Sequence, residues 1–318
     1  MEIALIKVHG SMNTFYMFEG EERDDYAQLA KHISTIDPDI DGILVILPST
    51  RAHAKMRVFN NDGSEASMCG NGLRCVARYV CEQQNIQKAV IETMKAFLSV
   101  RKKAVSNGEI ATYAVEISPV SFLLNSVPMN YLNQNEWINK PLPFVSKDIL
   151  FSAVSVPNPH LIGIVPATLQ NDSSHQEKWA QYFNSDNEYF PDGVNVSYVT
   201  AVEKGIFVRT YERGVGFTNA CGTAMTASAL ISCMSGLTPY GDVSVYNPGG
   251  LVKCTIASSE NKIDLELSGN ATYLAYSTFY WAQDDIEKSR ILFVKNSQEQ
   301  VSYNKFIEQV TTRSNLFS

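Results

Sequence analysis

The sequence of 318 residues predicts an α+β protein built from antiparallel sheets, each of which carries a helix. Long helical patterns are few and short strand-like patterns are many, and turn residues such as Asn61-Asp62-Gly63 separate them. Hydrophobic residues make up 45% of the chain and charged residues 19%, a globular composition that excludes a disordered chain or a coiled coil. The net charge of −7 provides no general attraction to nucleic acid or to anionic lipid.

The first half of the chain alternates between strand-like and helix-like spacing of its apolar residues. Residues 3–8 alternate and stop at His9-Gly10-Ser11, as a strand does before a turn. Apolar residues three and four apart predict helices, whereas short apolar runs bounded by Gly, Asp or Asn predict strands. The expected elements are therefore strands at 3–8, 14–18, 43–47 and 56–60, helices at 24–36 and 73–83, and short strands within 89–120.

The second half begins with a stretch of a different character. Residues 125–143 are rich in Asn and Pro and weakly periodic, so we expect a loop-like connection between two halves. The tail 284–318 is charged and is expected to be helical around 304–311. Between these segments the expected elements are strands at 151–156, 161–165, 194–200 and 206–211, a polar loop at 171–175, helices near 177–183 and at 223–235, and further strands up to about Trp281.

Three features of the sequence predict a cytoplasmic protein. No apolar run approaches the roughly 20 residues that a membrane span needs, and the first seven residues lack the basic-then-apolar plan of a secretory signal. The six cysteines are spread through a long chain with no export signal, which favours reduced thiols.

An internal repeat relates the two halves. Phe59 lies ten residues before Cys69, and Tyr211 lies ten residues before Cys221, so the two segments are offset by 152 residues. Each segment ends in Cys-Gly followed by a predicted helix. Similar segments at a fixed offset indicate a duplicated unit. Two halves related by an approximate two-fold axis would face their equivalent cysteines toward one another across a cleft.

A cysteine directly before a helix has a chemical use. The first N–H groups of a helix have no partner within it, and its positive end favours a thiolate over the thiol, whose pKa is ordinarily about 8.5. Cys69 is followed by Gly-Asn-Gly and Cys221 by Gly-Thr-Ala, which leave room for a small carboxylate on those N–H groups. One thiolate could remove a proton from one face of a carbon while the other thiol delivers a proton to the opposite face, which inverts the carbon.

Other interpretations of the cysteines are weaker. A lone cysteine before a helix is more often a buried packing residue, and only the duplication favours chemistry at Cys69 and Cys221. No Cys-x2-Cys motif or Cys/His cluster occurs, so no metal site is expected. The remaining cysteines fall inside or at the ends of predicted elements and are assigned to packing: Cys75, Cys81, Cys233 and Cys254.

Seven motifs follow one another in a single order: residues 8–13, 59–65, 68–75, 156–160, 190–196, 211–216 and 220–223. In this order they resemble the diaminopimelate epimerase family, a group of amino-acid epimerases and racemases that use no pyridoxal. The resemblance covers about residues 3–275. It implies two pseudo-symmetric domains, each an antiparallel, barrel-like sheet around a central helix, with the substrate between them. One half would comprise residues 1–122 plus 271–318 and carry Cys69, and the other would comprise 123–270 and carry Cys221.

The resemblance also implies roles for particular side chains. Cys69 and Cys221 would be the acid/base pair, assisted by His160 and Glu212. Amide oxygens suit a substrate ammonium group, and a guanidinium fork suits a carboxylate. Taken singly, His160 is more often a structural histidine, Glu212 an ordinary carboxylate and each asparagine a turn former. The implied substrate-binding residues are Asn13, Asn60, Gly70, Asn71, Asn158, Asn195, Arg213, Gly222 and Thr223.

The function that the resemblance implies is cofactor-independent epimerisation of LL-diaminopimelate to meso-diaminopimelate for lysine and peptidoglycan synthesis. The enzyme would be cytoplasmic, and the assembly that the resemblance implies is a homodimer. Thr14 stands where the family has aspartate, Phe217 where it has glutamate, and Pro157 where glycine is common. These departures keep open a racemase of another amino acid, such as histidine. A non-catalytic amino-acid-binding protein is a third possibility, but it would not need two thiols at helix starts.

Overall fold

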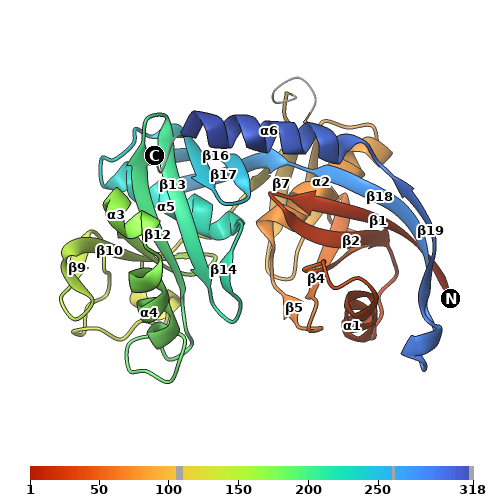
Figure 1. The fold of residues 1–318 in the computed structure, drawn as a ribbon, viewed down its shortest axis with the longest axis horizontal. Coiled ribbons are helices and arrows are strands. Elements are labelled where there is room, and N and C mark those ends of the chain that lie inside the picture. The colour runs from red at the N-terminus through yellow and green to blue at the C-terminus, as the bar shows by residue number, and fades with distance from the viewer. Residues whose placement is uncertain (105–109, 260–261, 315–318) are drawn as a thin grey trace. The chain divides into compact units, whose positions relative to one another are not determined.

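The computed structural model describes residues 1–104, 110–259 and 262–314 (Figure 1). The chain divides into two compact units, which we describe separately. Unit 1 comprises Met1–Glu116 and Ser268–Glu308, and unit 2 comprises Ile117–Leu267 and Gln309–Ser318. The sequence-based division into two epimerase halves stays a prediction. None of the described helices is both long and apolar enough to cross a membrane.

Unit 1 is a series of paired strands with helix α2 packed against it. Its helices are α1 (Tyr26–Ile36), α2 (Gly70–Gln83), η2 (Ile286–Lys288) and the first part of α6 (Glu299–Ser314). Its strands are β1 (Glu2–Gly10), β2 (Asn13–Glu19), β3 (Gly42–Leu47), β4 (Ala54–Asn60), β5 (Glu65–Ala66), β6 (Lys88–Glu92), β7 (Phe97–Lys102), β8 (Thr112–Glu116), β18 (Thr272–Tyr280) and β19 (Arg290–Asn296).

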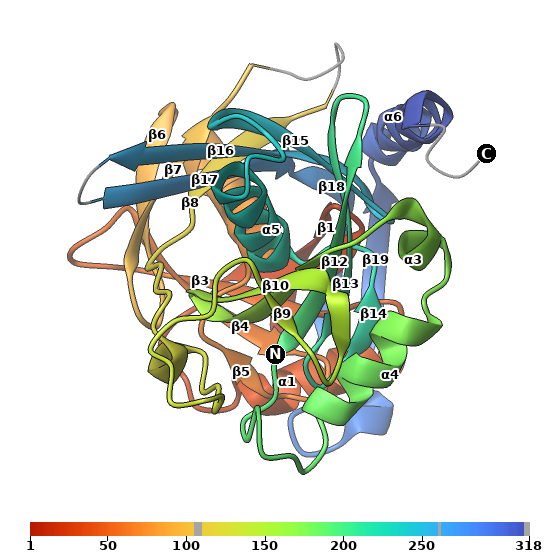
Figure 2. The same ribbon diagram turned by 90° about the vertical axis from the view of Figure 1, so that its left-hand side faces the viewer.

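Unit 2 contains helix α5 packed against a second series of strands (Figure 2). Its helices are η1 (Leu124–Ser126), α3 (Ala167–Asn171), α4 (Ser174–Phe183) and α5 (Gly222–Met234). Its strands are β9 (Lys140–Leu142), β10 (Ser146–Val156), β11 (Asn158–Ile164), β12 (Asn195–Val202), β13 (Gly205–Glu212), β14 (Gly216–Thr218), β15 (Gly241–Asn247), β16 (Gly250–Ser259) and most of β17 (Lys262–Asn270).

The two units have the same order of strand pairings. In unit 1, β1 pairs antiparallel with β2, β2 parallel with β3, β3 antiparallel with β4, β4 parallel with β6, and β6 antiparallel with β7. In unit 2, the strands β10, β11, β12, β13, β15 and β16 repeat that series of orientations step by step. A short strand, β5 or β14, pairs with β4 or β13 just before the helix in each unit. The strand topology therefore agrees with the duplication inferred from the sequence.

Both central helices are largely buried, but only α5 is apolar or small on nearly every side, whereas α2 also buries Arg74 and Arg78. Helix α2 contacts β1 to β4 and β6 to β8, and α5 contacts β10 to β13, β15 and β16. Every residue of α5 from Gly222 to Cys233 is buried, as expected of a helix that is apolar all round. In α2, a Cβ at Gly72 would lie 2.6 Å from Leu44 of β3, so the absent side chain lets the helix start approach the sheet. The strands thus fix where each helix begins, and with it the cysteine that precedes it.

The α+β class is confirmed, but the sheets are mixed rather than purely antiparallel. The parallel pairs are β2–β3, β4–β6, β11–β12 and β13–β15. Each pair is separated in sequence by at least one helix, and a helical crossover is what allows the next strand to run parallel.

The segment 125–143 is not merely a connection. Its side chains Val127, Met129, Trp137 and Leu142 are buried in the hydrophobic core of unit 2, together with Phe183 of α4. The expected loop thus contributes core residues, because its apolar side chains are spaced irregularly and fit neither helical nor strand periods.

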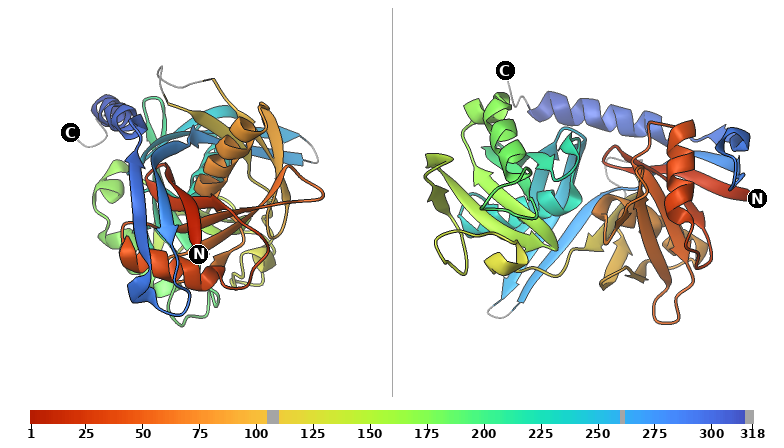
Figure 3. Two further views of the ribbon diagram at one scale, coloured as in Figure 1. Left: turned by 90° about the vertical axis from the view of Figure 1, so that its right-hand side faces the viewer. Right: turned by 90° about the horizontal axis from the view of Figure 1, so that it is seen from below.

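Three further elements differ from the sequence-based expectations. The polar loop expected at 171–175 contains the end of α3 and the start of α4. In the tail, β19 was missed although it runs beside β18 (Figure 3), and α6 starts at Glu299, earlier than expected. The expectation for residues 315–318 lies outside the described residues.

Candidate functional site

Cys69 is the N-cap residue of α2. Its Sγ accepts a hydrogen bond from the Gly72 N–H at 3.4 Å, and the extended backbone at Cys69 ends at the first helical turn. The Sγ atom also lies 3.5 Å from Asn13 Oδ1, to which the thiol donates. Asn71 Nδ2 donates to the same oxygen at 3.4 Å. Four of the residues predicted for the site, Cys69, Asn13, Gly70 and Asn71, therefore lie together in unit 1.

The loop that carries Asn13 is held by residues to which the sequence analysis gave no role. Ser11 and Met12 have φ angles of 53° and 66°, a left-handed conformation that is costly for residues other than glycine. Ser11 N–H donates to Asn270 Oδ1 at 2.8 Å, and the buried Arg74 donates to Ser11 Oγ at 3.0 Å. Ser11 lies in the motif at residues 8–13 and Arg74 in the motif at 68–75, but only the structure shows that the two side chains are in contact.

Asn60 occupies a turn. Its side-chain Nδ2 donates to Ser64 Oγ at 2.9 Å, and its backbone carbonyl accepts the N–H of Gly63, whose φ is +84°. These bonds are those of a turn-forming asparagine at the end of β4. Its proposed contact with substrate would use the side-chain oxygen.

Cys221 is the N-cap residue of α5 in unit 2. It is buried, and its Sγ lies 3.5 Å from Thr223 Oγ1. Burial raises the pKa of the Cys221 thiol, and the neighbouring Glu212 carboxylate raises it further. Glu212 in turn accepts a hydrogen bond from Thr218 Oγ1 at 2.5 Å. At neutral pH this cysteine is held as a thiol.

His160 lies on β11, fully buried, with Nε2 3.1 Å from Thr223 Oγ1. Burial, and secondarily the positive charge of Arg213, lowers the pKa of His160 to about 3, so the imidazole is neutral at physiological pH. Within the described part of the chain, His160 Nδ1 has no hydrogen-bond partner. Cys221, Thr223, His160 and Glu212 thus form one connected cluster.

The remaining predicted residues of unit 2 have different surroundings. Asn195, opposite His160 in the β11–β12 pair, accepts the backbone N–H of Arg213 at 2.9 Å, so its oxygen positions that residue. Arg213 Nη1 donates to the Asp192 carbonyl at 2.7 Å, and the side chain is otherwise exposed. Asn158, at the start of β11, is half-buried and makes no side-chain hydrogen bond among the described residues.

The residues that depart from the family motifs make contacts with neighbouring side chains of their own unit. Phe217 packs edge-on against Tyr211, with ring centroids 5.2 Å apart, and remains 38% exposed. Thr218 rather than residue 217 holds Glu212. Thr14 N–H donates to Asp41 Oδ2 at 2.7 Å, so Asp41 supplies a carboxylate beside the position where the family has aspartate.

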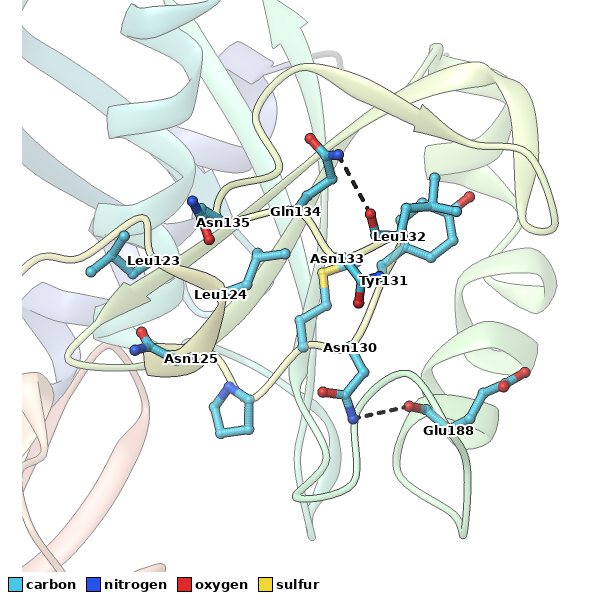
Figure 4. Close-up of a pocket in the computed structure, with 12 residues that line it drawn as sticks. Leu123, Leu124, Asn125, Asn130, Tyr131, Leu132, Asn133, Gln134, Asn135 and Glu188 are labelled. Carbon is cyan, nitrogen blue, oxygen red and sulfur yellow. Dashed lines mark hydrogen bonds between the residues drawn. The ribbon is translucent and has the colours of Figure 1, made fainter.

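A hollow of about 500 Å³ lies elsewhere in unit 2, formed by residues 123–125 and 128–135 and by Glu188 (Figure 4). In it, Asn130 Nδ2 donates to the Glu188 carbonyl at 3.3 Å. None of the predicted site residues lines this hollow. Among the described residues, no cluster of three or more His, Cys, Asp or Glu side chains is arranged to hold a metal ion.

Comparison with known proteins identifies the family. The sequence model for diaminopimelate epimerase matches residues 5–113 and 152–274. The chain belongs to the diaminopimelate epimerase family. Curated diaminopimelate epimerases of Listeria welshimeri and Listeria monocytogenes are 46% and 44% identical to it over 97% of each chain, and that of Enterococcus faecalis is 44% identical over 86% of this chain and 87% of its own. The predicted isomerase class is confirmed.

Solved structures show that this chain shares its fold with more distant proteins. A phenazine biosynthesis protein of the PhzF family from Bacillus anthracis has a TM-score of 0.66 at 15% identity, covering 88% of this chain and all of its own. A hydroxyproline epimerase from Agrobacterium vitis has a TM-score of 0.59 at 13% identity, covering 87% of this chain and 92% of its own. At these identities the likeness concerns the fold alone.

The two buried histidines make the stability of this epimerase depend on pH. His160 and His9 are both nearly inaccessible, and burial lowers their pKa values to about 3 and about 4, from 6.5 in the unfolded chain. The unfolded chain therefore binds more protons below pH 6.5, and stability falls as the pH drops from 6.5 toward 4. We expect each histidine to contribute a loss of about 3 kcal/mol at pH 4.

Urea unfolding between pH 7 and pH 4.5 measures this loss. His160→Gln should flatten the decline, because glutamine takes up no proton. His53→Gln is the comparison, since His53 is exposed and its ring accepts, among the described residues, only the Val90 N–H at 3.0 Å, and it should flatten the decline less than His160→Gln does. Equal slopes in all three proteins would contradict the assignment of the pH dependence to buried histidine.

Proposed function

We propose that this protein converts LL-diaminopimelate to meso-diaminopimelate by proton transfers at one α-carbon, with no cofactor. The observation that carries the proposal is the 46% identity, over 97% of both chains, to a curated diaminopimelate epimerase. The proposal extends to the pathway, namely the supply of meso-diaminopimelate for lysine and peptidoglycan synthesis in the cytoplasm, and to assembly as a homodimer.

Cys69 is proposed as the base in the resting enzyme. Its sulfur accepts the Gly72 N–H at the positive end of α2, an arrangement that stabilises negative charge on sulfur. The N–H groups of Gly70 and Asn71 would bind the substrate α-carboxylate and stabilise the charge that develops as the α-proton leaves. Asn13 Oδ1, which accepts from the protonated Cys69 thiol at 3.5 Å, would be released to bind the substrate ammonium group once Cys69 ionises.

Cys221 is proposed as the acid in the resting enzyme. Burial and Glu212 keep it protonated, so it can deliver a proton to the carbanion on the face opposite to Cys69. The N–H groups of Gly222 and Thr223 would also bind the carboxylate. His160, neutral because it is buried, and Glu212 would assist the proton transfers. For the reverse reaction the two cysteines exchange roles.

The distal end of the substrate carries a carboxylate and an ammonium group, so the site must supply a cationic donor for the first and acceptor oxygens for the second. Arg213 is exposed apart from one bond to a carbonyl, so its guanidinium can bind the distal carboxylate. The side-chain oxygens of Asn60 and Asn158 suit the distal ammonium group. Asn195 is proposed to act at the same end, where it already holds the backbone of Arg213 at 2.9 Å.

The test is hydrogen exchange at the α-carbon in deuterated water. With LL-diaminopimelate we expect meso product that carries one deuterium at the inverted carbon, because the proton delivered comes from a thiol in exchange with solvent.

The exposed ring of Phe217 favours a second candidate, a racemase of a less polar amino acid, so a panel of amino acids is included. Exchange with another amino acid but not with LL-diaminopimelate would support the racemase. Exchange with none would support a binding protein.

A further inference from the structure

We propose that the C-terminal helix α6 positions the loop His9–Asn13, and that Gln300 does so by fixing the tautomer of His9. This loop carries Asn13, so the kinetic part of the inference rests on the proposed function. All the residues concerned belong to unit 1. Gln300 is here a positioning residue, because it contacts neither Cys69 nor Asn13.

The loop needs support because of its backbone. Ser11 and Met12 are consecutive left-handed residues, with φ angles of 53° and 66°, a backbone conformation that is unfavourable for residues other than glycine. Such a conformation persists only where surrounding contacts determine it. It turns the chain so that Asn13 Oδ1 lies within 3.5 Å of both Cys69 Sγ and Asn71 Nδ2. A small relaxation of the loop would therefore move Asn13 away from the thiol.

The hydrogen bonds of His9 define its tautomer. Met12 N–H donates to His9 Nδ1 at 3.1 Å, and a backbone N–H can only donate. Asn270 Nδ2 lies 3.3 Å from the same nitrogen. Nδ1 must therefore carry a lone pair, which leaves the proton on Nε2. Protonation of Nδ1 would set two N–H groups against each other and remove the bond that holds Met12.

Gln300 matches this tautomer from the other side of the ring. Its Oε1 lies 3.0 Å from His9 Nε2 and accepts the proton there, while its Nε2 donates to Asn304 Oδ1 at 2.7 Å. The second bond orients the amide so that its oxygen faces His9. The fully buried Tyr303, one turn further along α6, packs edge-on against the imidazole at 4.6 Å and hydrogen-bonds with Ser11.

The support comes from a helix that lies outside the range matched by the family model, although curated relatives match over 97% of this chain. The diaminopimelate epimerase model matches this chain only as far as residue 274, and α6 begins at Glu299. The loop His9–Asn13 lies inside the matched range. A motif of the family is thus held in this chain by a helix that the family model does not include.

The charged groups around His9 indicate how the arrangement responds to acid. Arg74 of α2 disfavours the imidazolium and Glu299 of α6 favours it, while Gln300 and the Tyr303 ring are uncharged. Burial dominates, and the ring is neutral in the native protein at physiological pH. A carboxylate at position 300 would favour the doubly protonated ring, whose Nδ1–H cannot accept from Met12.

Three variants of the full-length protein test the proposal. Gln300→Leu removes the acceptor and should lower kcat/KM by about 10- to 100-fold through misplacement of Asn13, while circular dichroism stays native. Gln309→Leu makes the same change at an exposed position of α6 and should leave kcat/KM unchanged. Gln300→Glu should restore activity at alkaline pH and lose it as the pH falls, with an inflection that the wild type lacks.

A readout independent of activity accompanies the kinetics. The ¹⁵N chemical shifts of the histidine side chains distinguish the two tautomers, and the wild type should show His9 protonated on Nε2. Gln300→Leu should shift the His9 signals, and Gln309→Leu should not. If Gln300→Leu matches Gln309→Leu in both kcat/KM and ¹⁵N shifts, the positioning role is overturned. Absence of epimerase activity in the wild type would instead count against the proposed function and leave the ¹⁵N result to decide the role of Gln300.

Discussion

Cys69→Ala and Cys221→Ala should each lower the rate of epimerisation by roughly 10³-fold, because each removes a group that must transfer a proton. The more informative result concerns isotope exchange. With one thiol left, a proton can still be removed from one face of the α-carbon and returned, after exchange with solvent, to the same face. Each variant should therefore catalyse deuterium exchange without inversion, and for one epimer only. The two variants should prefer opposite epimers.

Mass spectrometry of LL- and meso-diaminopimelate recovered from deuterated water measures this pattern. Cys81→Ala is the matched control, because Cys81 lies near the end of the helix that Cys69 precedes, and its loss should leave inversion intact. Exchange of both epimers by Cys69→Ala, or the same preference in both alanine variants, would contradict the assignment of one thiol to each face.

A large loss of stability at neutral pH is expected from substitutions at the contact between α6 and α2. Arg78 of α2 is buried and forms two hydrogen bonds with Glu299 of α6, at 2.6 and 2.8 Å. It also donates to Glu82 and to the Ala271 carbonyl, and its guanidinium lies 3.7 Å from the centre of the Tyr273 ring. Burial opposes the charge, but these partners, Glu299 foremost, raise the pKa of Arg78 above its usual value.

Removing one partner of a buried ion pair leaves the other without compensation, which typically costs 3–5 kcal/mol. Since the Glu299 side chain is 35% exposed, we expect Glu299→Ala to lower the free energy of unfolding by about 2–3 kcal/mol. Arg78→Leu should cost more, because Glu299 and Glu82 then both lose their shared partner.

A double-mutant cycle monitored by urea unfolding isolates the pair. The double variant should be less destabilised than the sum of the single variants, because the second substitution removes a charge that the first left unpaired. Asp285→Asn is the control, since Asp285 pairs with Lys288 at an exposed position where an ion pair contributes little. Strict additivity would contradict a direct energetic coupling of Arg78 with Glu299.

Much of this architecture could be predicted from the sequence because it depends on local spacing. The helices that follow Cys69 and Cys221, the strands before them and the 152-residue offset are all periodic signals, and the structure contains them within a few residues. The parallel pairing of strands could not be predicted from apolar spacing. The orientation of a strand depends on the path of the preceding helix, which apolar spacing does not encode.

In the candidate site, too, local features could be predicted from the sequence and long-range contacts could not. Motifs predicted which residue types gather, but not that Thr223 would link Cys221 to His160, or that Ser11 and Met12 would adopt left-handed backbone. The partnership between Arg74 and Ser11 joins residues 63 positions apart, and that between His9 and Gln300 joins residues 291 apart. Contacts of this kind follow from tertiary packing, so they have no signal within a sequence window.

The unequal exposure of the cysteines has a practical consequence. All six lie in the described part of the chain and none of them forms a disulfide there; Cys69 is half-exposed and the other five are buried. An alkylating probe of modest size therefore meets one accessible sulfur, and that sulfur caps α2. Protection of this sulfur from alkylation by added diaminopimelate can therefore report on occupancy of the helix start in solution, in the native sequence and without a cysteine-free background.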